Sequence, residues 1–160
     1  MNKKVSSVLL VDDDDDCNFF HKRLLTKMKC TDHVHISMDG RDALNYLTSN
    51  INAKSQQPNI IFLDINMPRM NGWEFLEEYK MFDDELKKNI ILIILSTSLN
   101  PDDKTRADSC TDVAGFCNKF LDQASLKEII SNTLRTWRKK SRESQRLSAL
   151  LFSLRIYKPD

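Results

Sequence analysis

Hydrophobic residues along this chain alternate between short apolar runs and longer segments with helical spacing. The runs at 60–63 and 90–95 contain only large apolar residues, which is typical of strands buried on both faces of a parallel sheet. Three further runs are rich in β-branched or aromatic residues and are bounded by turn residues. The five predicted strands cover residues 5–11, 33–38, 60–63, 90–95 and 113–118.

Between these runs, apolar residues recur at intervals of three and four, which predicts amphipathic helices. Asn71-Gly72 opens one helix, and Asn100 is a suitable cap for another that has Pro101 in its first turn. The last helix is expected to begin near Asp122 or Ser125, because residues 125–128 match a capping box. The predicted apolar faces are Phe19, Phe20, Leu24, Leu25 and Met28, then Ala43, Leu44 and Leu47, then Trp73, Phe75, Leu76 and Tyr79, and finally Leu126, Ile129, Ile130, Leu134 and Trp137.

Strands and helices alternate five times in this interpretation. Such alternation favours an α/β fold, in which a parallel sheet is covered on both faces by right-handed crossovers. The chain of 160 residues suits one domain of this kind. We expect the domain to span 1–138, with a C-terminal extension at 139–160.

Composition indicates an ordinary globular protein, with 41% hydrophobic and 29% charged residues. The four cysteines have no CxxC pair or zinc-ligand spacing, which favours reduced thiols in the cytoplasm. The apolar run near the N-terminus is too short for a signal peptide, and no later run is long enough to span a bilayer. We therefore expect a cytoplasmic protein without a membrane segment.

Charge is distributed unevenly along the chain. Residues 135–160 hold eight Lys or Arg and two acidic residues, a net charge of +6, which leaves −5 for residues 1–134. Four leucines in this basic region fall on one helical stripe. The favoured interpretation is a prolonged last helix; a homodimer contact or a target-docking helix is second, and DNA binding is third because the segment is too short for a helix-turn-helix. The stripe consists of Leu147, Leu150, Leu151 and Leu154.

Polar residues follow the predicted strands where the carboxyl ends of parallel strands should meet. Asp12 and Asp13 follow the first strand, Asp64 follows the third, and Ser96 and Lys119 follow the fourth and fifth. Carboxylates gathered at one edge repel one another unless a cation is present, and Mg²⁺ is the hard cation that such ligands prefer. A carboxylate nucleophile, a divalent ion, an ammonium and a hydroxyl together predict phosphoryl transfer to an aspartate.

At these positions the sequence resembles the response-regulator receiver domain of two-component signalling, over residues 4 to about 137. Residues 64–72 are similar to the phosphoacceptor motif D-x-x-M-P-x-M-x-G, with every key position kept. Ser96 stands where the family has Thr or Ser, and Lys119 stands where it has its lysine. Phe116 occupies the place of the aromatic switch residue.

The resemblance implies a flavodoxin-like doubly wound sheet of five parallel strands, in the order 2-1-3-4-5, with five helices and the C-terminal helical extension. It implies that Asp64 accepts a phosphoryl group from a histidine kinase or histidine phosphotransfer protein. Mg²⁺ would be bound by Asp13, Asp64 and the backbone carbonyl of Asn66, with Asp12 acting mainly through a bound water. Lys119 would pair with a phosphoryl oxygen.

The same resemblance implies a switch. Ser96 would hydrogen-bond to the phosphoryl group, draw its loop inward and let Phe116 turn into the vacated space. The output would be a contact with an unknown downstream protein, since no DNA-binding module is recognisable. The expected signalling surface comprises the helix that starts at Pro101, the strand at 113–118 and the start of the last helix, with Leu99 and Phe116 as candidates.

One position departs from the family pattern. Phe120 follows Lys119, where the family has a proline that is often preceded by a cis bond. Because a cis non-proline bond costs about 3–4 kcal/mol, the Lys119–Phe120 bond is predicted to be trans or strained. A trans bond could displace the Lys119 ammonium and slow phosphorylation.

Two other functions remain as alternatives. One is a phosphorylation-impaired receiver that only binds partners, which Phe120 leaves open. The other, less favoured, is a phosphatase of the haloacid dehalogenase type, whose D-x-D-x-T/V motif lies on the first strand. Asp12 and Asp14 supply D-x-D, but Asp16 occupies the position of Thr or Val.

Overall fold

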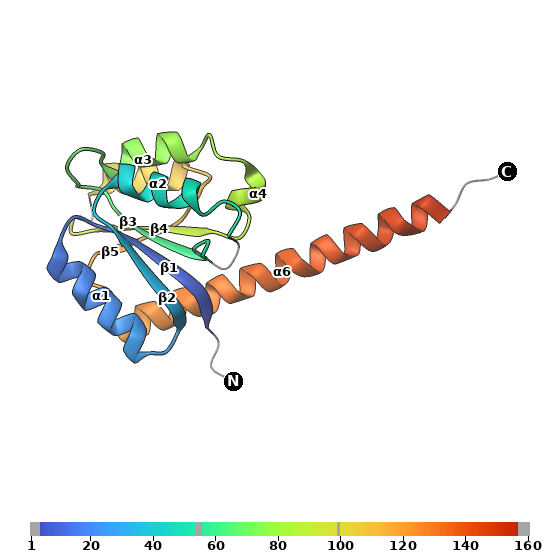
Figure 1. Ribbon diagram of the computed structural model, residues 1–160, viewed down its shortest axis with the longest axis horizontal. Coiled ribbons are helices and arrows are strands. Elements are labelled where there is room, and N and C mark those ends of the chain that lie inside the picture. Colours follow the sequence, from blue (N-terminus) through green and yellow to red (C-terminus); the bar gives the residue numbers. More distant parts are fainter. Residues whose placement is uncertain (1–3, 54–55, 99, 157–160) are drawn as a thin grey trace.

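The computed structural model describes residues 4–53, 56–98 and 100–156. Five parallel strands form one sheet in the order β2-β1-β3-β4-β5 (Figure 1), which confirms the predicted class and strand order. The strands are β1 (Val5–Val11), β2 (Thr31–Ser37), β3 (Ile60–Asp64), β4 (Ile91–Ser96) and β5 (Val113–Asn118). The helices are α1 (Asp15–Lys27), α2 (Gly40–Ser49), α3 (Gly72–Tyr79), α4 (Asp84–Lys87), α5 (Pro101–Ser109) and α6 (Gln123–Ile156).

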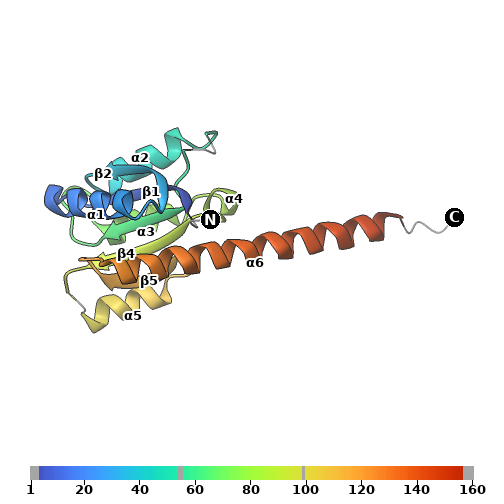
Figure 2. The same cartoon turned by 90° about the horizontal axis from the view of Figure 1, so that it is seen from below.

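Helices cover both faces of the sheet, with α2, α3 and α5 on one face and α1 with the first half of α6 on the other (Figures 1 and 2). Side chains of successive strand residues therefore enter different cores. Leu9 and Leu63 belong to the core under α2 and α3, whereas Leu10 and Phe62 belong to the core under α1 and α6. This burial on both faces explains why β3 and β4 are continuously apolar in sequence.

Polar caps fix where the helices begin. Asn71 and Glu74 form a reciprocal capping box at α3, and Asn100 caps α5 as predicted. The predicted capping box at 125–128 was wrong. The helix α6 begins at the earlier of the two predicted positions, because the carboxylate of Asp122 accepts a hydrogen bond of 2.7 Å from the backbone N–H of Ser125. The short helix α4 was not predicted.

The predicted apolar face of α1 is also wrong in part. Phe19 and Phe20 are 66% and 49% exposed. The helix instead buries Cys17, His21, Leu24 and Leu25, which follow one another at helical spacing. This rotation is set at the first turn, where the side-chain amide of Asn18, also buried, donates 2.8 Å to the backbone carbonyl of Asp12.

The last helix, α6, is 34 residues long and extends away from the domain (Figures 1 and 2). Leu126 and Ile130 are buried in its first half, and Trp137 packs partly buried against the same core. Lys140 contacts the domain through its ammonium, which donates 3.2 Å to the carbonyl of Lys88. The helix has no break at 138, so the domain boundary predicted there stays a prediction. Within the described ranges, no helix is both long and apolar enough to cross a membrane.

Candidate phosphoacceptor and metal site

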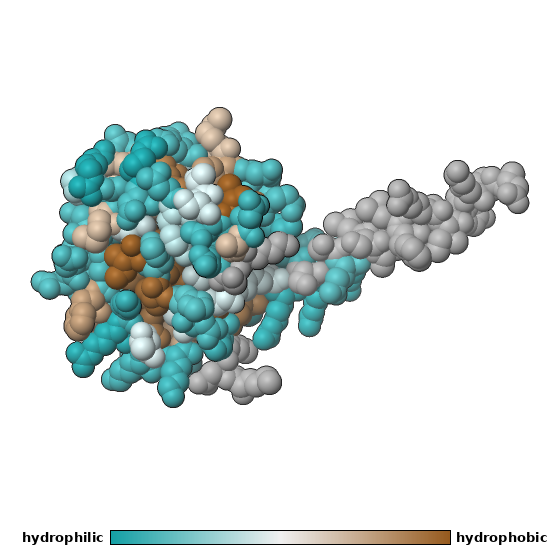
Figure 3. Space-filling view, in the orientation of Figure 1, coloured by the Kyte–Doolittle hydropathy of each residue, from teal (hydrophilic) through white to brown (hydrophobic). Residues whose placement is uncertain are grey.

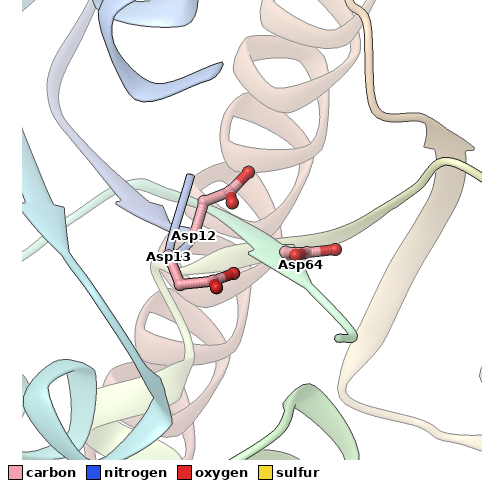
Figure 4. A group of neighbouring side chains, drawn as sticks. All are labelled: Asp12, Asp13 and Asp64. Atoms are coloured by element: carbon pink, nitrogen blue, oxygen red, sulfur yellow. The ribbon is translucent and has the colours of Figure 1, made fainter. Parts of the chain in front are cut away.

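Three carboxylates meet at the carboxyl edge of the sheet. Asp12 and Asp13 come from the end of β1 and Asp64 from the end of β3, and one ligand oxygen of each lies within 4.8 Å of the others (Figure 4). Asp12 and Asp64 are buried, whereas Asp13 is exposed. The predicted cluster is therefore present, with a solvent-facing side at Asp13.

The side chain of Lys119 joins the two buried carboxylates. Its ammonium lies 3.0 Å from Asp12 Oδ1 and 3.2 Å from Asp64 Oδ2, and the residue is only 6% exposed. The trans geometry predicted for Lys119–Phe120 is found, since no cis peptide bond occurs in the described part of the chain. Phe120 therefore does not displace the ammonium from the carboxylates.

Burial and mutual repulsion perturb the titration of this cluster. Burial raises the pKa of Asp12 and, together with the charge of Asp12, that of Asp64. Burial alone would lower the pKa of Lys119, but the hydrogen bond that its ammonium donates to Asp12 and the charges of both carboxylates outweigh burial and raise that pKa. Three carboxylates and one ammonium leave a formal charge of −2, which one divalent cation would balance.

A close backbone approach positions Asp64. The backbone N–H of Gly72 donates 2.8 Å to the carbonyl of Ile65, and a Cβ at Gly72 would lie 2.5 Å from the carbonyl oxygen of Asp64. Only glycine allows α3 to begin this close to the end of β3. The same loop places Arg69 in the left-handed region (φ 63°), and its guanidinium pairs with the buried Asp39 carboxylate that caps α2.

Ser96 lies at the end of β4, next to Lys119, and is buried. The backbone N–H of Lys119 donates 2.9 Å to the carbonyl of Ser96. The Ser96 hydroxyl donates 2.7 Å to the carbonyl of Ser98 and accepts 3.2 Å from its N–H. This hydroxyl is thus held by its own loop and is not bonded to Asp64.

The remaining predicted residues occupy the surroundings of the cluster. Phe116 on β5 is half-buried and packs against the core under α2 and α3. Asn66 is exposed in the loop after β3. Phe120 is 65% exposed directly after Lys119. Leu99, named as a candidate of the signalling surface, lies outside the described residues.

Two buried residues of α1 beside the site were missed in the sequence. Asn18 holds the backbone of Asp12, and His21 is buried on the same side of α1. Burial lowers the pKa of His21. Their spacing from Leu24 and Leu25 was the available signal, but the two phenylalanines between them had the stronger hydrophobic pattern.

Comparison with known proteins agrees with this geometry. The chain matches the sequence pattern of the family described as response regulator receiver domain over residues 8–131. A crystal structure of a two-component response regulator from Cytophaga hutchinsonii is 32% identical, with a TM-score of 0.78, and the match covers 83% of this chain and 99% of that one.

Two named regulators are also similar. The probable methanogenesis regulatory protein FilR2 of Methanothrix harundinacea is 28% identical over 130 residues, 81% of this chain and 82% of FilR2. Response regulator Rcp1 of Synechocystis is 33% identical over 97 residues, 60% of this chain and 65% of Rcp1. The Mn²⁺-bound structure of Rcp1 matches with 28% identity and a TM-score of 0.62, over 83% of this chain and 94% of that one. The chain belongs to the response regulator receiver domain family.

Proposed function

We propose that this protein is a phosphorelay response regulator that accepts a phosphoryl group on Asp64. The observation that carries this proposal is the shared Lys119 ammonium, which lies within hydrogen-bond distance of both Asp12 and Asp64. A buried carboxylate with a raised pKa needs such a partner to stay ionised and nucleophilic. The protein then acts as a signalling acceptor rather than as a turnover enzyme.

In the transfer, a carboxylate oxygen of Asp64 attacks the phosphorus of the donor. The new bond joins this oxygen to phosphorus, and the bond between phosphorus and the donor imidazole nitrogen breaks, with its electron pair remaining on that nitrogen. Lys119 pairs with the Asp64 carboxylate before the transfer and would pair with a phosphoryl oxygen during it. This contact would keep the incoming group aligned.

The donor set fits Mg²⁺. Asp12, Asp13 and Asp64 offer hard oxygen ligands close together, with a formal charge deficit that a divalent ion balances. The backbone carbonyl of Asn66 is a further proposed ligand, and Asp12 would act mainly through a bound water. When bound, the ion would neutralise negative charge on the phosphoryl oxygens. The Mn²⁺-bound structure of the relative Rcp1 supports a divalent ion in this family.

The switch is proposed to begin at Ser96. Its hydroxyl is hydrogen-bonded to Ser98, so bonding to a phosphoryl oxygen requires this local turn to change. A movement of the loop between β4 and α5 would alter the space beside Phe116. The surface formed by α5, β5 and α6 would then carry the signal to a downstream protein.

The donor is proposed to be a histidine kinase or histidine phosphotransfer protein in the cytoplasm. Any protein donor must contact the carboxyl edge of the sheet, where Asp64 lies. Phe19 and Phe20 on α1 and Phe120 after Lys119 are large exposed apolar residues in segments that adjoin this edge. We refer to these three residues as the phenylalanine rim, and exposed aromatic residues of this kind are suited to a protein contact.

The decisive experiment is intact-mass measurement after incubation with acetyl phosphate, with and without Mg²⁺. The wild type is expected to gain the mass of one phosphoryl group only when Mg²⁺ is present. Asp64→Asn should gain none. Asp16→Asn is the matched control, because Asp16 lies in the same acidic run but outside the cluster, and it should behave like the wild type.

Two results would contradict the proposal. Phosphate that persists in Asp64→Asn would place the nucleophile elsewhere. A wild type that accepts no phosphate from acetyl phosphate or from a phosphorylated histidine kinase would indicate a receiver that only binds partners.

A further inference from the structure

The C-terminal half of α6 lies beyond the contacts that anchor the helix to the domain. Lys140 is the last residue of α6 with a described contact to the domain, and the helix continues to Ile156. The extension of 16 residues is about 24 Å long. Helices in proteins owe most of their stability to the packing of an apolar face, so a partner for such a face would stabilise this segment.

The leucine stripe, defined as Leu147, Leu150, Leu151 and Leu154, has a symmetric spacing. Its positions are separated by three, one and three residues, so they read the same in both directions about a point between 150 and 151. An antiparallel copy of the helix therefore places Leu147 opposite Leu154 and Leu150 opposite Leu151. A surface that complements itself across a two-fold axis is the property of an isologous dimer.

Charge selects the antiparallel orientation. Residues 138–146 carry five Lys or Arg and one Glu, a net charge of +4. Arg138, Lys139, Lys140 and Arg142 are exposed where α6 leaves the domain, and hydrophilic side chains cover this region in Figure 3.

In a parallel pair the basic blocks of the two copies, residues 138–146 of each, would lie about 10 Å apart, which is the usual distance between packed helices. In an antiparallel pair centred on the stripe they would be separated by roughly 25 Å along the axis. The screening length at physiological salt is about 8 Å. The repulsion between the two blocks is therefore largely screened in the antiparallel pair. Arg155 would there lie level with Arg146 of the second copy, so two like-charged pairs remain, against six in a parallel pair in register.

We propose that the C-terminal half of α6 is a self-association helix, which pairs antiparallel with the same segment of a second copy of this chain. The interface is two stripes of four leucines, smaller than that of a permanent dimer. The dimer is accordingly expected to be reversible and concentration-dependent. It goes beyond the phosphoacceptor function and does not depend on it.

Sedimentation equilibrium of the full chain at several protein concentrations tests the association. The wild type should show a monomer–dimer equilibrium. The double variant Leu150→Glu/Leu151→Glu should dissociate roughly 100-fold more readily, because it places unpaired charges at the centre of the contact. Ser153→Glu is the matched control, since it adds a negative charge on the same helix about 110° around the axis from the midline of the stripe. It should dimerise like the wild type.

Disulfide trapping tests the orientation. A mixture of full chains carrying Leu147→Cys and Leu154→Cys should form the mixed dimer across the interface. Leu147→Cys alone should not link to itself, because antiparallel copies place these two positions about 10 Å apart along the axis.

Three outcomes would overturn the inference. They are a wild type that stays monomeric throughout, a dimer that survives the double substitution, and efficient self-linking of Leu147→Cys, which indicates parallel helices. A monomer whose melting temperature falls in the double variant would show that the segment packs on its own domain instead. Phosphorylation of Asp64 is measured separately on each variant and should not change.

Discussion

Lys119 and Gly72 determine the geometry of Asp64 in different ways. Lys119 compensates the charge of two buried carboxylates at once, at 3.0 and 3.2 Å. Gly72 contributes no side chain, and this absence lets the first turn of α3 lie against the backbone of Asp64. Lys119 therefore sets the electrostatics of Asp64, and Gly72 sets its position.

Gly72→Ala should destabilise the fold and impair phosphorylation together. The added Cβ would meet backbone atoms of Asp64 and Ile65 at 2.5 and 2.9 Å, which cannot be relieved by rotating a side chain. A loss of about 2 kcal/mol in the free energy of unfolding is expected, measured by urea titration.

Gly115→Ala is the matched control for this substitution. Its Cβ would lie 3.8 Å from the nearest atom, in the Ile93 side chain, which is ordinary contact. Its stability should change by less than about 0.5 kcal/mol. Equal losses in both variants would mean that the close approach at Gly72 is not the cause.

The raised pKa of Asp64 predicts a pH dependence of stability. A folded carboxyl with a raised pKa contributes stability that is present below its ordinary pKa of 3.8 and lost as pH rises through the raised value. In EDTA, Asp64→Asn should therefore gain stability over the wild type as pH rises from about 4 towards 7, by an amount on the order of 1 kcal/mol. A difference that stays constant over this range in urea titrations would contradict the pKa assignment.

At the scale of elements, α1 buries a different face from the one that its hydrophobic pattern predicts. Its two adjacent phenylalanines look like core residues, yet the helix turns them outward and buries His21 and Asn18. The buried position of Asn18 is explained by its hydrogen bond to the backbone of Asp12, which no local pattern reveals. Local hydrophobicity was overridden by the requirements of the site.

The phenylalanine rim should matter for transfer from a protein donor and little for folding. Phe19→Ala and Phe20→Ala are expected to change the free energy of unfolding by less than about 0.5 kcal/mol, because both side chains are exposed. Transfer from a phosphorylated histidine kinase should slow about tenfold in the double variant, while phosphorylation by acetyl phosphate should be unchanged.

Met81→Ala is the control for the rim. Met81 is 84% exposed and lies just after α3, in the turn that leads to α4. It should alter neither reaction. Slower transfer from both donors in the rim variants would indicate damage to the site rather than loss of a docking surface.

At the scale of the whole molecule, the sheet was predictable because its strands are apolar, and its site was predictable because polar residues directly follow those strands. Buried strands such as β3 and β4 are apolar up to their last residue. The polar residues at their carboxyl ends lie at one edge in any parallel sheet. The short helix α4 was not predicted, since a single side-chain cap at Asp83 decides it, and the sequence left open whether α6 begins near Asp122 or at Ser125. The hydrogen bond that holds the Ser96 hydroxyl was equally invisible in the sequence.

Mg²⁺ should stabilise the whole molecule, because the three carboxylates converge only in the folded state. Saturating Mg²⁺ is expected to raise the melting temperature of the wild type by a few degrees, measured by scanning calorimetry. Asp13→Asn should lose most of this increase, and Asp16→Asn should retain it. An increase of the same size in Asp13→Asn would show that the ion acts elsewhere.

The helix α6 starts just after Lys119, the lysine that contacts Asp64. Asp122, its cap, is three residues from Lys119, and the helix of 34 residues is about 50 Å long. Its first half packs on the sheet as far as Lys140, so any tilt of that packed half would be carried to the far end as by a rigid rod. A tilt of about 5° at its base moves the far end by about 4 Å over that length. Displacements too small to alter the receiver domain visibly would thus become atomic-scale movements at the leucine stripe.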